Sequence, residues 1–247
     1  MVRIAAFSDP HGNLPALAAV RKAVDAVRPD YVAICGDLAM NGPDPAGTVD
    51  LIRDLERAGA FVTLGNTDLA VTDGDYAAAF PWFGDGVPEG HVIAAEWARD
   101  QLGDDRVDWL RRLPSERRLR IDDKLVLFCH ASPGSLTDGL LVDLDPVVTI
   151  ERVSGTDAAV IVCGHTHMPE IREIGWRTIV NDGSAGYVFD GDPTASWALI
   201  DIDGGRVTAE IQRTSYDVMA AANAVSARGL PGDVYRAATI RTGKLVR

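Results

Sequence analysis

Short apolar runs alternate with longer amphipathic segments along the first third of the chain. The runs are rich in β-branched and aromatic residues, as buried strands are, and the intervening segments repeat apolar residues at helical spacing. The expected strands cover residues 4–7, 31–35 and 61–64, and the expected helices cover residues 14–27, capped by Asn13, and 44–58. This β-α-β-α-β order predicts parallel strands in a layered α/β fold.

The same reading extends to the rest of the chain. Strands are expected at residues 125–129, 159–163, 178–180, 197–201 and 207–211, and helices at 92–102, 106–113 and 217–227. Residues 76–90 are aromatic and glycine-rich, which predicts a loop or a short helix. Short turns such as residues 203–205 predict antiparallel pairing and a second sheet. With 247 residues, 47% of them hydrophobic, and no repeat or linker, a single domain over residues 1–247 is expected.

Charge and composition narrow the classes of partner. The formal charge of −12 disfavours broad binding to nucleic acid or to an anionic membrane, but a metal site can still attract a small phosphorylated substrate. No apolar run reaches the roughly 18 residues of a membrane span, and the N-terminus lacks a signal-peptide pattern. Three widely spaced cysteines without a CxxC motif argue against a disulfide framework. We therefore expect a cytoplasmic protein, either a monomer or a homodimer.

Polar clusters follow the expected strands up to residue 163. Four of the five histidines lie in these clusters, and glycines precede several of the polar residues. The cluster residues with metal-ligating side chains are Asp9, His11, Asp37, Asn66, His130, His165 and His167. Because open α/β sheets bind ligands at the carboxyl ends of their strands, we expect these side chains to meet at one site.

The donor types and their number indicate which metals would bind. Imidazoles combined with carboxylates suit Mn, Fe, Zn or Co, with manganese as our first choice, and no cysteine has the spacing of a structural zinc site. Seven donors are too many for one ion that keeps an open position. They fit two divalent ions that share one carboxylate, the arrangement that clamps both oxygens of a displacement at phosphorus.

The motifs DPH, GD, GN, H and GHTH, in this order, resemble the calcineurin-like metallophosphoesterase family from Val2 to about Ile202. The segments FSDPHGNLPAL, NGPDP and NDGSAG are similar to the small bacterial and archaeal phosphodiesterase branch. The resemblance implies an α/β fold of two packed mixed β-sheets flanked by helices, a four-layer α/β/β/α sandwich.

The resemblance also implies roles for the seven residues. Asp9, His11 and His167 would hold one ion, Asn66, His130 and His165 the other, and Asp37 would bridge them. A metal-bridging hydroxide would then attack phosphorus in line. The implied substrate is a phosphodiester or a nucleotide-type phosphate. The alternatives are a phosphomonoester or phosphoprotein substrate, or a non-catalytic protein-interaction scaffold such as a retromer subunit of this fold.

One position departs from the family pattern. Most members carry a histidine after GN that is often assigned as general acid, whereas this chain has Thr67 followed by Asp68. Threonine does not deliver a proton near neutral pH as imidazole does, and general acid help contributes about 10²–10⁴-fold. His91, the one remaining histidine, either replaces that acid or is a surface residue at a helix start. Thr67, Asp68 and His91 are therefore the candidate catalytic residues, and a good leaving group is expected.

Three other stretches have two interpretations each. Tyr76, Phe80, Trp82 and Phe83 either pack on a nucleobase or form a small core under a loop. Residues 181–186 either bring backbone N–H groups towards the metals or support the histidines of GHTH. Asn41 and Asp44 either hydrogen-bond to metal ligands or cap a helix.

Overall fold

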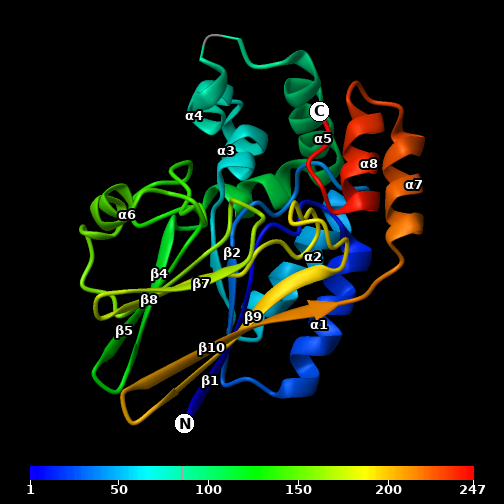
Figure 1. The fold of residues 1–247 in the computed structure, drawn as a ribbon. Helices are drawn as coiled ribbons and strands as arrows, with labels where there is room; N and C mark the ends of the chain where they lie inside the picture. Colours follow the sequence, from blue (N-terminus) through cyan, green and yellow to red (C-terminus); the bar gives the residue numbers. More distant parts are fainter. Residues whose placement is uncertain (85) are drawn as a thin grey trace.

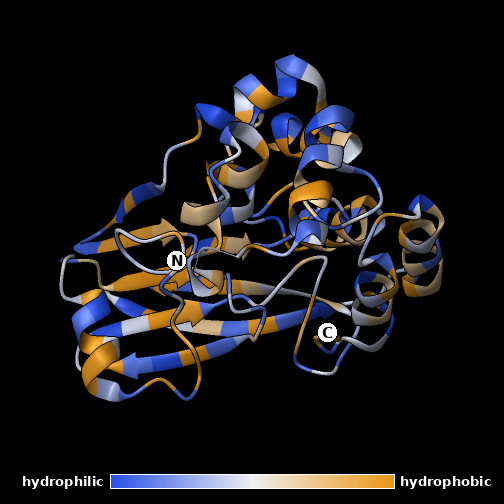
Figure 2. Ribbon diagram, turned by 90° about the horizontal axis from the view of Figure 1, so that it is seen from above, coloured by the Kyte–Doolittle hydropathy of each residue, from blue (hydrophilic) through white to orange (hydrophobic). Residues whose placement is uncertain are grey.

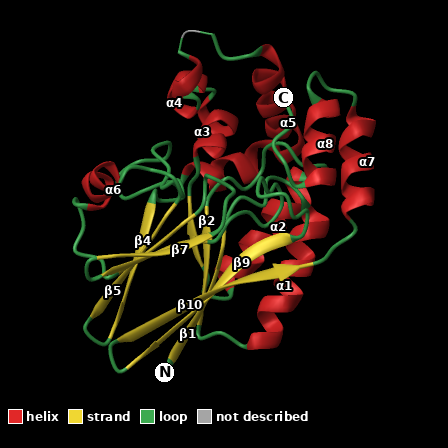
Figure 3. Cartoon of the chain, viewed as in Figure 1, coloured by secondary structure: helices red, strands yellow, loops and turns green. Residues whose placement is uncertain are grey.

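The computed structural model describes residues 1–84 and 86–247, and it has two five-stranded sheets packed face to face (Figure 1). Helices pack on the outer face of the first sheet, and a short helix packs on the second (Figure 3). The prediction of two packed mixed sheets flanked by helices is confirmed. Among the described residues, no helix has the length and apolar character needed to cross a bilayer.

The first sheet has the strand order β10-β9-β1-β2-β3. Its strands are β1 (Val2–Phe7), β2 (Tyr31–Cys35), β3 (Phe61–Thr63), β9 (Ala195–Asp203) and β10 (Arg206–Thr214). The strands β1, β2 and β3 run parallel, while β9 pairs antiparallel with both β1 and β10. The helices α1 (Leu14–Val27) and α2 (Pro45–Arg57) connect the parallel strands, as parallel pairing requires.

The second sheet has the order β4-β5-β6-β8-β7. Its strands are β4 (Glu116–Ile121), β5 (Lys124–Cys129), β6 (Val160–Cys163), β7 (Glu170–Ile174) and β8 (Arg177–Asn181). The three central strands β5, β6 and β8 are parallel, and β4 and β7 pair antiparallel at the two edges. Both sheets therefore present several strand carboxyl ends, where loops can converge.

Three apolar layers hold the sheets and helices together. The layer between the sheets joins Ile4 and Ala33 of the first sheet to Phe128 and Val162 of the second, and all four side chains are buried. A second layer packs α1, α2 and α5 (Glu89–Arg111) on the first sheet. The third packs α6 (Pro146–Val153) on the second sheet. The helices alternate hydrophobic and hydrophilic residues, as expected of elements with one buried face (Figure 2).

Local sequence signals explain the helix ends that were predicted correctly. Asn13 caps α1 by accepting a hydrogen bond from the Ala16 N–H, and Asp44 caps α2 through the Gly47 N–H. The two helices expected at 92–102 and 106–113 form one longer element, α5, which is broken at Gly103 with φ 67° and ψ 170°. The expected loop or short helix contains α4 (Tyr76–Ala79) and the 3₁₀ turn η1 (Pro81–Phe83).

Five elements were not predicted from the sequence. They are α3 (Asn66–Asp73), β4, α6, β7 and α8 (Asp233–Thr242), the last of which packs against α7 (Val218–Arg228). The strands β4 and β7 are edge strands that consist mostly of charged residues, so they lack the continuous apolar run of a buried strand. The pair α7 and α8 packs on Tyr187, which brings the end of the chain close to the loops described next.

Candidate metal centre

The seven candidate ligands lie in loops that follow parallel strands of both sheets. Asp9 and His11 follow β1, Asp37 follows β2, and Asn66 begins α3 directly after β3. His130 follows β5, and His165 and His167 follow β6. The sheets pack so that these loops gather on one side of the molecule, which is why residues 156 positions apart come into contact.

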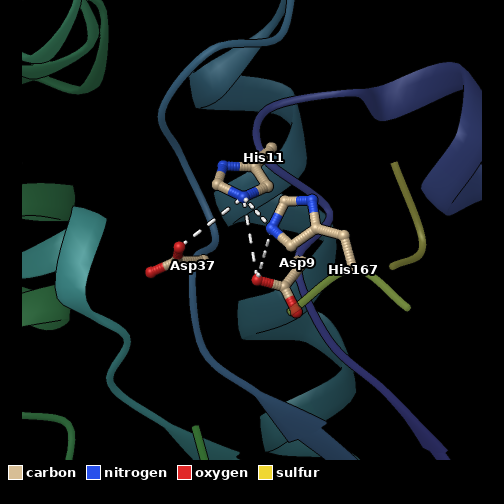
Figure 4. A group of neighbouring side chains, drawn as sticks. All are labelled: Asp9, His11, Asp37 and His167. Atoms are coloured by element: carbon tan, nitrogen blue, oxygen red, sulfur yellow. Dashed lines mark hydrogen bonds and ion pairs between the residues drawn. The ribbon is translucent and has the colours of Figure 1, made fainter. Parts of the chain in front are cut away.

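A first group of four side chains surrounds one point (Figure 4). The Nε2 atom of His11 lies 3.5 Å from Asp37 Oδ2, 3.7 Å from Asp9 Oδ1 and 3.2 Å from His167 Nε2. The Nε2 atom of His167 also lies 3.2 Å from Asp9 Oδ1. All four residues are buried.

A second group shares Asp37 with the first. His130 Nε2 lies 3.4 Å from Asp37 Oδ1, 2.9 Å from Asn66 Oδ1 and 3.1 Å from His165 Nδ1. The Nδ1 atom of His165 is in turn 3.0 Å from Asn66 Oδ1. Asp37 thus directs one carboxylate oxygen to each group, and it is the one residue common to both.

Backbone carbonyl groups fix the tautomer of three of the histidines. A carbonyl oxygen can only accept, so each Nδ1 atom that it contacts must carry the proton. The pairs are His11 with Met40 at 3.0 Å, His130 with Cys35 at 2.8 Å, and His167 with Tyr187. In the neutral ring this leaves the Nε2 lone pair free, and in all three residues Nε2 faces the centre of its group.

The first group is therefore a cluster of acceptors without the donors that would pair them. The lone pairs of His11 and His167 face each other, and the buried Asp9 Oδ1 has no hydrogen-bond partner among the described residues. Burial is the main cause that lowers the pKa of His11, and likewise that of His165, to about 4, so both rings are neutral at pH 7. Bound cations would satisfy these facing lone pairs, and the donor set of nitrogen and carboxylate oxygen fits divalent transition metals.

Two carboxylates shape the electrostatics of the buried cluster. Burial raises the pKa of Asp9, but His167 and the other imidazoles outweigh it and hold that pKa well below its usual range. Burial lowers the pKa of His130, but Asp37 and Asp9 outweigh it and raise that pKa. Asp9 is thus ionised, and the cluster holds negative charge that a metal ion would neutralise.

The backbone around the ligands is strained. Five of the seven candidates have positive φ angles, a region that residues other than glycine rarely occupy and that clusters at functional sites. They are Asp9 (53°), His11 (49°), Asp37 (56°), His165 (66°) and His167 (57°). The spacing of these residues in the sequence gave no sign of the positive φ angles. The angles direct several side chains from short loops towards a common centre.

Glycines at two positions allow the loops to approach each other. A Cβ atom on Gly65 would overlap the backbone nitrogen and Oδ1 of Asp37, and one on Gly164 would overlap Ser8 and Asp9. Neither glycine is needed for a positive φ. They are needed because the ligand loops approach each other so closely that a side chain at either position would overlap the neighbouring loop.

The segment at residues 181–186 supports the ligand loops. Asn181 donates from Nδ2 to the Gly164 carbonyl oxygen at 2.9 Å, and Ser184 donates from its hydroxyl to the Asp9 carbonyl oxygen at 2.8 Å. Asp182 is buried and accepts a hydrogen bond from Ser8. These contacts favour the supporting interpretation of this segment, since it joins the loop after β1 to the loop after β6.

Thr67 and Asp68 lie beside the centre in different ways. The Thr67 N–H donates to Asp37 Oδ1 at 2.8 Å, while the Thr67 hydroxyl is buried without a hydrogen-bond partner among the described residues. Asp68 accepts from the N–H groups of Leu38 at 2.8 Å and Gly65 at 3.0 Å, so it ties the loop after β2 to the loop after β3. Burial, followed by the nearby Asp37 charge, raises the pKa of Asp68 to about 7.

His91 lies away from the seven ligands, in the first turn of α5. Its ring contacts Phe83 and Phe80, with centroid distances of 5.0 and 5.5 Å. Burial, and secondarily the charge of Arg236, lower its pKa. The ring thus packs against Phe80 and Phe83. A catalytic role for His91, Thr67 or Asp68 stays a prediction.

Sequence reasoning missed the contribution of α8. Arg236 donates from Nε to Asn41 Oδ1 at 3.2 Å, and Asn41 Nδ2 lies 3.4 Å from His11 Nδ1. Arg236 also donates to the carbonyl oxygen of Gly90 at the start of α5. No motif marks Arg236, because its role depends on packing between segments almost 200 residues apart.

Comparisons with known proteins place these features in a family. A model of the calcineurin-like phosphoesterase superfamily domain matches residues 2–205. An uncharacterized protein of Methanocaldococcus jannaschii is 27% identical over an alignment of 246 residues. The alignment covers 92% of this chain and 93% of that protein.

Two crystal structures are similar over nearly the whole chain. A metallophosphoesterase from Sphaerobacter thermophilus is 27% identical with a TM-score of 0.75, over 98% of this chain and 99% of that one. A hypothetical protein from Pyrococcus horikoshii has a TM-score of 0.84 at 20% identity, over 98% and 99% of the two chains, and at that identity it shows the shared fold alone.

Proposed function

Because the chain belongs to the calcineurin-like phosphoesterase superfamily, we propose that it is a metal-dependent phosphoric ester hydrolase that favours phosphodiesters or nucleotide-type phosphates. One observation carries this proposal. Two groups of side chains with metal-ligating atoms lie side by side and share Asp37. A single structural ion would not need this second set of ligands.

Two divalent ions, with manganese as the first choice, would fit the two groups. Asp9, His11 and His167 would hold one ion, Asn66, His130 and His165 the other, and Asp37 would contact both. When bound, such a pair supplies an activated water for in-line attack on phosphorus and neutralises the charge that develops there.

The residues of the chain have two tasks in this scheme. The first is to orient ligands, which the carbonyl groups behind His11, His130 and His167 perform by fixing each ring. Asn66 is oriented similarly, since its Nδ2 donates to the Ala79 carbonyl oxygen at 2.9 Å. The second task is to limit the negative charge of the centre. Asn66 contributes a neutral oxygen, whereas a carboxylate at this position would weaken the attraction of the centre for an anionic substrate.

The preference for a substrate with a good leaving group follows from the surroundings of Thr67. Its hydroxyl is buried, and His91 packs behind aromatic rings rather than among the ligands. We infer that neither side chain gives a proton to a departing alcohol. A substrate whose leaving group is stable as an anion needs no such proton, which favours activated diesters and nucleotide phosphates.

Hydrolysis of bis-p-nitrophenyl phosphate and of p-nitrophenyl phosphate by metal-stripped, Mn²⁺-reloaded protein tests the proposal. The two esters share one leaving group, so their relative rates report the number of ester bonds that the site prefers. We expect faster turnover of the diester. Faster turnover of the monoester would favour a phosphatase, and no turnover of either by protein that binds metal would favour a scaffold.

A further inference from the structure

The candidate metal centre opens to solvent beside one aromatic side chain. Of the seven candidate ligands, His165 alone is partly exposed, while the other six are buried. The ring of Trp82 lies against His165 with a centroid distance of 6.0 Å and an interplanar angle of 54°. Trp82 is 54% exposed. An exposed aromatic residue by itself is unremarkable in a folded protein, but here the ring borders the open side of the centre.

The position of Trp82 is fixed from behind. Phe80, only 3% exposed, contacts the Trp82 ring edge to face at 5.8 Å, and it also contacts His91 at 5.5 Å. Phe80 therefore forms the small core under the loop, while Trp82 remains on the outside. The interpretation as a small core thus applies to Phe80, and the interpretation as a nucleobase contact is left for Trp82.

The loop is also tied directly to the candidate metal ligands. Asn66 Oδ1 lies 2.9 Å from His130 Nε2 in the second group, and Asn66 Nδ2 donates to the carbonyl oxygen of Ala79, the residue before Phe80. The same side chain thus belongs to the centre and anchors the segment that carries Trp82. This linkage ties the segment that carries Trp82 to one of the candidate metal ligands.

We propose that Trp82 forms a subsite that stacks the nucleobase of a nucleotide substrate whose phosphate lies at the candidate metal centre. This inference rests on the proposed function of the same site and adds the class of substrate. An indole face binds any base by stacking without sequence readout. The net charge of −12 disfavours long nucleic acids, so a single nucleoside ester is the ligand that fits one exposed ring.

Calorimetry on Mn²⁺-loaded protein tests the subsite without relying on turnover. AMP and ribose 5-phosphate carry the same sugar phosphate and differ by the base. We expect the wild type to bind AMP more tightly, and Trp82→Ala to reduce that preference by roughly 5- to 150-fold, the range that stacking on one aromatic side chain supplies. Trp82→Phe keeps an aromatic face and should keep most of the preference.

Trp176→Ala is the matched control. Trp176 is also exposed, at 63%, and it lies in the turn between β7 and β8, at the opposite end of β8 from Asn181. This variant should leave the ratio of the two affinities unchanged. Equal affinity for AMP and ribose 5-phosphate in the wild type, including no binding of either, would overturn the subsite, and so would an unchanged ratio in Trp82→Ala.

Activity assays separate this inference from the proposed function. Methyl p-nitrophenyl phosphate and thymidine 5′-(p-nitrophenyl phosphate) share a leaving group, and only the second carries a base. Hydrolysis of both with no base preference would retain the hydrolase and reject the subsite. Base-dependent binding of AMP that Trp82→Ala removes, without hydrolysis of any ester, would retain the subsite and reject the hydrolase.

Discussion

The two halves of the candidate metal centre are built differently. Asp9, His11 and His167 form a buried half with a carboxylate, and all three have positive φ angles. Asn66, His130 and His165 form a half with a neutral amide, and only His165 in it has a positive φ. His165 is also the ligand that solvent reaches.

This difference indicates that the two halves on either side of Asp37 have different roles. The buried half carries negative charge and strained backbone, features that favour tight retention of a cation. The half that includes the partly exposed His165 has a neutral amide in place of a carboxylate and adjoins Trp82, features that favour contact with an anionic substrate. Variants that alter one half at a time can test these roles.

The largest effect is expected from Asp37→Asn, since this residue belongs to both halves. The amide keeps an oxygen that can accept from the Thr67 N–H, so the fold should persist. Loss of residues that only orient metal ligands typically costs about 10–100-fold, and a ligand shared by both ions should cost more than roughly 100-fold in kcat. The assay is hydrolysis of bis-p-nitrophenyl phosphate with Mn²⁺.

Asp25→Asn serves as the control for that variant, because Asp25 is exposed and pairs with Arg21 on α1. It should change turnover by less than about twofold, as surface substitutions usually do. Turnover of Asp37→Asn equal to that of Asp25→Asn would remove the basis for the shared ligand.

A smaller and asymmetric effect is expected when one histidine of each half is replaced. A site saturated at 100 times its Kd stabilises the fold by about 2.7 kcal/mol, or roughly 5–10 °C in Tm for a chain of this size. His11→Ala and His165→Ala should each lose one such increment on addition of Mn²⁺. The metal-free His11→Ala protein should also melt below metal-free His165→Ala, because His11 is the more buried side chain.

Thermal melts with and without Mn²⁺, together with metal analysis, distinguish the two variants. Loss of both metal increments in either single variant would show that the halves bind cooperatively rather than separately. An unchanged increment in both variants would show that the ions bind elsewhere.

The smallest effect is expected from Thr67→Val. The hydroxyl is buried without a hydrogen-bond partner among the described residues, so its removal at constant shape should be neutral or stabilising by up to about 1 kcal/mol. The backbone N–H that contacts Asp37 remains. Turnover of bis-p-nitrophenyl phosphate should stay within about twofold, and a loss near the 10²–10⁴-fold expected of a general acid would assign that role to Thr67.

The sequence predicted the parts of the molecule that depend on local pattern. Apolar runs and capping residues such as Asn13 and Asp44 located most strands and the first helices because these signals act over a few residues. The edge strands β4 and β7 were missed because they are mostly charged and lack an apolar run, and the helix α3, which begins at Asn66, was not predicted.

The candidate site was recognisable because its ligands follow strand ends in a regular way. The sequence did not reveal how the ligands are held. The carbonyl groups of Met40, Cys35 and Tyr187 that fix the histidines are backbone atoms without a residue signature. Arg236 likewise acts through a contact between distant segments, which only the folded chain brings together.

Two ions that share Asp37, both of them needed for hydrolysis, are the core of the proposed mechanism. Titration of metal-free protein with Mn²⁺, in which bound metal and the rate of bis-p-nitrophenyl phosphate hydrolysis are both followed, tests this pair. We expect binding to saturate at two equivalents and activity to rise mainly with the second. Full activity at one equivalent, or saturation of binding at one, would show that a single ion suffices.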